Sequence, residues 1–213
     1  EKVREEKQEK ATLYEWLDYQ HKLSDQNPKI RFKVVYLRSG AHLCATVINA
    51  KKILEEDKRL NGVIVESTLY HYETNDINEA FYLVAILNSS ILDELIKPMQ
   101  SKGEFGERDI HKKPLEFPIP KYNPNNPIHI KLSEFGRKGS EIANQILPQI
   151  LKEHGYDKKL AERGTLVPQE VATVRKNLKE SLKDLIEQID SLVIELFKEK
   201  IEDVISLERY IKE

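Results

Sequence analysis

Hydrophobic and polar positions alternate in three segments between Arg31 and Tyr72, as they do in β-strands that bury one face. The alternation predicts three strands, at Arg31–Leu37, Leu43–Asn49 and Val63–Tyr72, each rich in β-branched or aromatic residues. Turn-forming residues at Arg38–Gly40 and Asn61–Gly62 separate these segments. We therefore expect a small sheet in this part of the protein.

The hydrophobic spacing changes to three or four residues between Ala80 and Ile96, which indicates helix. The polar stretch Asn88-Ser89-Ser90 interrupts this run, and such side chains favour helix caps over helix interiors. The interruption predicts two short helices that meet there, with Pro98 ending the second one.

A polar stretch with two glycines and several basic residues runs from Gln100 to Lys113. Its basic residues are Lys102, Arg108, His111, Lys112 and Lys113. A flexible basic loop between ordered elements suits contacts to phosphates and bases, whereas the alternative is a loop whose charges only face water. The next segment, Leu115–Pro120, contains two prolines and is expected to be extended, at an edge or rim of the fold.

Helical spacing dominates the rest of the chain and also its beginning. We predict a helix from the N-terminus to about Ser24, another over Ile128–Lys152, a long one from Pro168 and a final short one at Ile201–Ile211. Two glycines near the start of the second of these are expected to break or loosen it. Together the elements predict an α+β fold, with a mixed α/β domain at 1–127 and a helical region, a bundle or a spacer, at 128–213.

Composition narrows the classes of partner. Hydrophobic residues make up 39% of the 213 positions and charged residues 33%, so a core can form. The formal net charge of −2 means that a nucleic-acid binder of this composition must gather its positive charge locally. Cys44, the single cysteine, fits a reducing cytosol, so we expect a cytoplasmic protein. No apolar run reaches membrane-spanning length. Because the chain begins with Glu1 and not with methionine, we expect a fragment or a processed chain.

Several segments resemble one protein family. The segments are YLVAILNSSILDELIK at 82–97, GEFGERDI at 103–110, LEFPIP at 115–120 and QIDSLVIELF at 188–197. Together they resemble the target-recognition and C-terminal regions of N6-adenine DNA methyltransferases, and most of all the fused restriction–modification enzymes of type IIG. LYEWLDYQHKL and YLRSGAHLCATVI, further upstream, also fit the region that follows the catalytic domain in that family.

The resemblance implies a DNA specificity module. Its expected partners are double-stranded DNA and a methyltransferase catalytic domain, in cis or in trans, and that missing domain would bind S-adenosylmethionine. The segments near Arg38–His42 and Lys102–Lys113 would face DNA, with Arg and Lys gripping phosphates and one or two of them reading base edges. The residues assigned to DNA are Arg38, Ser39, His42, Lys102, Arg108, His111, Lys112 and Lys113.

Catalytic motifs are missing from the sequence. The family's Asn/Asp-Pro-Pro-aromatic motif has its nearest counterpart in Asn123-Pro124-Asn125-Asn126, which lacks the second proline and the aromatic residue. No glycine-rich nucleotide-binding motif is present, and the histidines lack metal-ligand spacing. We therefore expect no catalysis, cofactor or metal in this chain by itself.

A second reading gives the chain a different function. The apolar stripe that follows Pro168 suits a helical bundle, so the protein would then be a helical protein-interaction module, able to form oligomers, that does not bind DNA. The salt dependence of DNA binding separates the two readings, because a phosphate-gripping module loses affinity steeply as salt rises.

Overall fold

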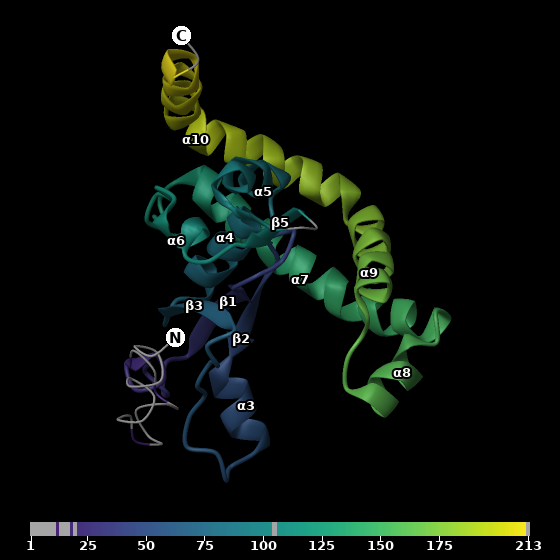
Figure 1. The fold of residues 1–213 in the computed structure, drawn as a ribbon. Coiled ribbons are helices and arrows are strands. Elements are labelled where there is room, and N and C mark those ends of the chain that lie inside the picture. The colour runs from purple at the N-terminus through teal and green to yellow at the C-terminus, as the bar shows by residue number, and fades with distance from the viewer. Residues whose placement is uncertain (1–11, 13–17, 19–20, 104–105, 212–213) are drawn as a thin grey trace.

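The computed structural model describes residues 12, 18, 21–103 and 106–211, and it describes side chains up to residue 198 except those of 102–108. It contains a three-stranded antiparallel sheet in the order β2-β1-β3. The strands are β1 (Phe32–Leu37), β2 (Ala45–Asn49) and β3 (Leu69–Thr74). The other described elements are mainly helices (Figure 1), which confirms the predicted α+β class.

The third strand begins later than predicted. Residues 63–66 have no strand partner, and β3 starts only at Leu69. The reason is that the Gln26 side chain takes both backbone groups of Val65: its Oε1 accepts from Val65 N at 2.9 Å, and its Nε2 donates to Val65 O at 2.7 Å. Glu66 then accepts from the backbone N–H of Thr68 at 2.9 Å, which turns the chain into the strand.

The Asn88-Ser89-Ser90 interruption separates two helices, as predicted. α4 (Ile77–Leu87) ends at Asn88, and α5 (Ser90–Ile96) starts after Ser89, whose hydroxyl accepts from Leu92 N at 3.1 Å. A short 3-10 helix, η2 (Lys97–Met99), follows and contains Pro98.

The basic stretch is more ordered than a loop. It holds a two-stranded hairpin, β4 (Ser101–Gly103) and β5 (Gly106–Asp109). A one-turn helix, α6 (Lys113–Glu116), then occupies the start of the segment predicted to be extended. Proline at the first turn of α6 costs no hydrogen bond, so Pro114 begins this helix rather than keeping the segment extended.

The remaining helices lie before α4 and after α6. They are α3 (Ala50–Glu56), α7 (Pro127–Glu153), α8 (Tyr156–Arg163), α9 (Pro168–Ser181) and α10 (Lys183–Ile211). The glycines of α7 do not break it, and the final short helix is continuous with α10. The long helix predicted from Pro168 is divided near Leu182. Most of the predicted N-terminal helix lies outside the described residues, and residues 21–24 form turns.

α4 is the centre of the packing. Residues 82–87 of this helix are all buried, between the sheet on one side and α7 on the other. Figure 1 shows α10 lying over α5 and α4, and α8 and α9 standing to the side. Leu132 of α7 and Phe197 of α10 belong to the same core cluster as Phe32 of β1. Helices from both sides of residue 127 contribute to this core, and the domain boundary at 127 stays a prediction. Within the described chain, no helix is long and apolar enough to cross a membrane.

Candidate nucleic-acid interface

Two segments assigned to DNA, far apart in the sequence, lie side by side. The backbone N–H groups of Ile110 and His111 both donate to the carbonyl oxygen of Arg38, with N···O distances of 3.0 and 2.9 Å. Ser39 and Asp109 form an isolated antiparallel bridge next to them. The chain that follows β1 is therefore hydrogen-bonded through its backbone to the chain at the end of β5, so Arg38, Ser39 and His111 are neighbours.

A buried tyrosine supports this junction from below. The hydroxyl of Tyr36 donates to the carbonyl oxygen of His111 at 2.9 Å, and the ring of Tyr36 stacks on Tyr70 with 5.7 Å between centroids. Burial raises the pKa of the Tyr36 phenol, so the hydroxyl keeps its proton and remains a donor. His111 itself has a φ of 50°, in the left-handed region that residues other than glycine rarely adopt.

The β4–β5 hairpin extends from the same junction. Ser101 begins β4, and its hydroxyl donates to Oδ2 of Asp109 at the end of β5 at 2.7 Å. Lys102 and Arg108 lie in these strands, but their side chains are outside the described residues, so their assignment to DNA stays a prediction. Gln100 precedes the hairpin and ties it to the β1–β2 loop, because its Nε2 donates to the carbonyl oxygen of Gly40 at 3.3 Å.

The side chain of His42, in the β1–β2 loop, contacts α5. Its Nδ1 lies 2.9 Å from Oδ2 of Asp93 in α5, and Oδ1 of Asp93 accepts from Leu43 N at 2.8 Å. Ala45, two residues after Leu43, is bound by Asn88. The side-chain amide of Asn88 accepts from Ala45 N at 2.9 Å and donates to Ala45 O at 2.8 Å. These contacts give His42 a positioning role within the loop, and its assignment to DNA stays a prediction.

Lys112 and Lys113 follow His111 at the start of α6. Lys112 is exposed, and Lys113 Nζ lies 3.8 Å from Glu116 in the same helix. An exposed ion pair of this kind contributes little to stability and is readily exchanged for another anion. Both ammonium groups are therefore available to a phosphate.

A cavity of about 530 Å³ opens beside Lys112. Positive and negative groups both line it, so its chemistry does not select one class of ligand. The lining residues are Lys22, Asp25, Gln26, Val65, Glu66, Ser67, Leu69, Tyr70, His71, Lys112 and Leu115.

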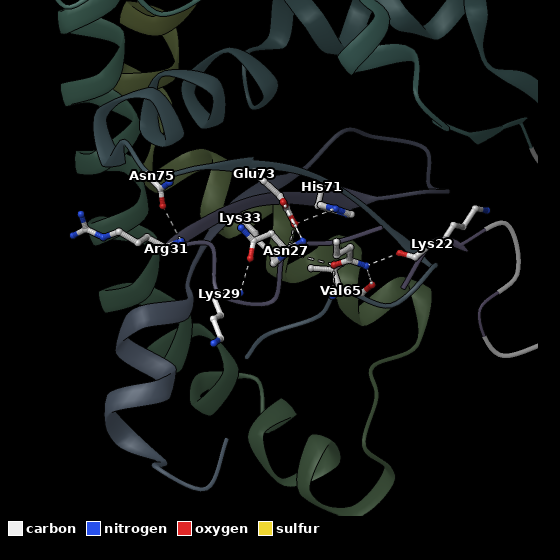
Figure 2. Close-up of polar contacts among 10 residues, drawn as sticks. Lys22, Asn27, Lys29, Arg31, Lys33, Val65, His71, Glu73 and Asn75 are labelled. Atoms are coloured by element: carbon white, nitrogen blue, oxygen red, sulfur yellow. Dashed lines mark hydrogen bonds and ion pairs between the residues drawn. The ribbon is translucent and has the colours of Figure 1, made fainter. Parts of the chain in front are cut away.

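A buried polar cluster lies on the face of the sheet that turns away from α4 (Figure 2). Lys33 is fully buried and donates to Oε1 of Glu73 and, at 3.4 Å, to Oε1 of Gln26. Glu73 also accepts from the backbone N–H of Asn27 at 3.1 Å. Burial and the nearby Lys33 lower the pKa of His71, which keeps that imidazole neutral although it lies 3.7 Å from Glu73. The cluster fastens the 26–27 turn to the sheet, which is a structural role.

Little in the amino-acid pattern indicates these supporting residues. Lys33, Asn88, Asp93 and Gln100 are not among the predicted site residues, because their partners lie on other elements. The local signal that could have been used is Lys33, a charged residue inside an otherwise apolar strand. Within 12, 18, 21–103 and 106–211, no three His, Cys, Asp or Glu side chains come together as metal ligands.

Comparisons with known proteins leave the family of the chain open. No protein-family model, no curated protein and no solved structure matches it.

Proposed function

We propose that this chain is the DNA target-recognition module of an N6-adenine DNA methyltransferase or restriction–modification enzyme. The observation that supports it best is the pairing of Arg38 with Ile110 and His111, because it joins the two segments that the family resemblance assigns to DNA. A module of this kind does no chemistry. It chooses the sequence at which a catalytic domain, in cis or in trans and carrying S-adenosylmethionine, meets its adenine.

The residues of the interface divide into two roles. Arg38, Lys112 and Lys113 supply positive charge to phosphates, which sets affinity and register but carries no sequence information. The β4–β5 hairpin and the β1–β2 loop supply the groups that form hydrogen bonds to bases. A two-stranded ribbon is narrow enough to enter the major groove.

Salt dependence tests the proposal directly. Fluorescence anisotropy of the chain on a labelled duplex, measured from about 50 to about 200 mM salt, should show log affinity falling linearly with log salt. Replacement of Arg38, Lys112 and Lys113 by alanine together should reduce that slope by about one for each phosphate that the variant no longer neutralises. Absence of DNA binding at every salt concentration would rule the proposed function out.

A matched control removes charge from the other end of the sheet. Lys51 and Lys52 of α3 have side chains that are 60% and 71% exposed, and they follow Asn49, which pairs with Phe32 at the far end of β1. Replacement of both by alanine should leave the salt slope and the affinity nearly unchanged. An equal loss in this control and in the interface variant would show non-specific attraction instead of a defined surface.

Arg108 is the residue for which the resemblance makes the sharpest expectation. The guanidinium group can form two parallel hydrogen bonds to guanine or to a phosphate, which lysine cannot reproduce. If Arg108 reads a base, Arg108→Ala should weaken cognate binding by about 1–3 kcal/mol and relax selectivity at one position. If it grips a phosphate, all sequences should weaken alike, and if it only shapes the loop through Glu107 or Asp109, neither should change.

A helical interaction module is the second candidate function. Its support is the exposure of apolar side chains in the helical region, where Val171 of α9 is 50% and Ile194 of α10 is 48% exposed. A concentration-dependent oligomer in sedimentation, together with no affinity for DNA at low salt, would favour this candidate over the first.

A further inference from the structure

His111 is held in a backbone conformation that its residue type disfavours. Its φ of 50° crowds the Cβ atom against the following carbonyl group. Its N–H donates to the Arg38 carbonyl oxygen at 2.9 Å, and its own carbonyl oxygen accepts from the buried Tyr36 hydroxyl at 2.9 Å. Backbone strain persists where the surrounding structure fixes it in this way, and such positions cluster at functional sites.

We propose that His111 reads a base edge and sets the specificity of the DNA interface at one position, an inference that rests on the proposed function. The backbone of His111 is fixed from the buried side, whereas its side chain is 43% exposed beside Arg38 and Ser39. Base readout requires a side chain placed on a rigid support, because a displacement of a fraction of an ångström breaks a directional hydrogen bond. The long and flexible Lys112 needs no such support to reach a phosphate.

The neighbour of His111 favours a base over a phosphate. Oδ2 of Asp109 lies 3.6 Å from His111 Nε2, and the Ser101 hydroxyl holds the same carboxylate oxygen at 2.7 Å. A fixed carboxylate repels a phosphate placed against this imidazole but does not repel an uncharged base edge. The two ring nitrogens can donate or accept, so they suit the donor and acceptor pattern of the major groove.

Two substitutions separate the contribution of the side chain from that of the backbone. His111→Gly removes the imidazole and accepts the left-handed conformation freely, and His111→Ala removes the imidazole and keeps the strain. His21 also has a positive φ, 57°, and its side chain is 80% exposed, so His21→Gly is the matched control.

The experiment uses duplexes enriched from a random library by the wild-type chain, with affinities measured on these and on every single-base-pair variant. His111→Gly and His111→Ala should both lose discrimination at the same position by about tenfold to hundredfold, with the other positions unchanged. His111→Gly should melt no lower than wild type, and His111→Ala should melt below His111→Gly. His21→Gly should leave discrimination unchanged.

The outcomes also separate this inference from the proposed function. If the wild-type chain enriches no sequence, the proposed function fails and the inference falls with it. If it enriches a sequence and His111→Gly keeps the discrimination at every position, only the role of His111 is overturned. An equal weakening on all duplexes would likewise overturn it, because that result describes a phosphate contact.

Discussion

A Cβ atom on Gly136 of α7 would lie 2.1 Å from the carbonyl oxygen of Phe81 in α4. The two helices therefore touch through their backbones at this point, without a side chain between them. Arg137, the next residue of α7, covers the ring of the same Phe81, with its guanidinium carbon 4.7 Å from the ring centroid. The close packing of α4 against α7 therefore requires a residue without a Cβ atom at position 136.

Gly136→Ala should destabilise the protein by about 3 kcal/mol or more, because α4 and α7 must move apart to admit the methyl group. Gly139→Ala in the same helix is the control. There the nearest atom to the new Cβ is the tip of Leu185 at 3.4 Å, so the better helix propensity of alanine should leave stability equal or higher by up to about 1 kcal/mol. Urea unfolding of both variants measures the difference, and equal stabilities would contradict the close approach.

The pair of Lys33 and Glu73 should respond unequally to loss of either partner. Lys33 is fully buried, whereas the Glu73 side chain is 23% exposed. Glu73→Gln leaves a buried charge without its counter-charge and should cost about 3 kcal/mol, while Lys33→Met leaves a carboxylate that water can reach and should cost less. A double-mutant cycle by chemical denaturation should give a cost for the pair well below the sum of the single costs. Additive costs would show that the two groups do not interact.

His129 should make the stability of the fold depend on pH below neutrality. This buried imidazole accepts from the Asn123 N–H through Nδ1 at 3.0 Å and stacks on Tyr82, and burial lowers its pKa. Because the folded state then binds a proton less readily than the unfolded state, stability is full above the ordinary value of 6.5 and falls as pH drops below it.

His129→Asn is the variant that tests the pH dependence, since its amide oxygen can accept in place of Nδ1. The difference between the free energies of unfolding at pH 7.5 and at pH 5.5 should be smaller in this variant than in the wild type. The remaining dependence should include His71, whose pKa is lowered in the same direction. An unchanged pH dependence in His129→Asn would show that His129 is not the group that titrates.

Glu170 should control the acid stability of the helical region. Lys159 and Arg163 of α8 both donate to its carboxylate, at 2.6 and 2.8 Å, and the backbone N–H of Val167 donates to it at 3.0 Å. These bonds, the one from Lys159 first, lower its pKa from 4.5 to about 2. The stabilisation is therefore full above about pH 4.5 and is lost as pH falls towards 2.

Glu170→Gln should remove part of the acid-induced loss of helix between these pH values, as measured by circular dichroism. The variant should be less stable than wild type at neutral pH, where the carboxylate is charged and paired. Glu162→Gln, at an exposed position in α8, is the control and should change neither. A Glu170→Gln variant that follows the wild-type acid profile would exclude the carboxylate as its cause.

Elements whose ends are set by neighbouring residues could be predicted from the sequence. Elements whose ends are set by contacts with distant residues could not. The two helices around Ser89 were predictable because a serine cap acts within three residues. The start of β3 was not, since Gln26 binds Val65 from a distant turn, and the β4–β5 hairpin was not, since Ser39 and Asp109 join it to another loop. The family resemblance assigned both Arg38 and His111 to DNA, but nothing in the sequence predicted that their backbones pair or that the backbone of His111 is left-handed.

The β1–β2 loop is closed at both of its ends by groups outside it. At one end the Arg38 carbonyl oxygen accepts from Ile110 and His111, and at the other Asp93 and Asn88 hold the backbone of Leu43 and Ala45. Between these ends Ser39 bridges Asp109 and the carbonyl oxygen of Gly40 accepts from Gln100 at 3.3 Å, so the loop is held along its length. These contacts act on backbone groups of the loop, so the side chains at positions 39 and 41 can be exchanged while the path of the loop is kept.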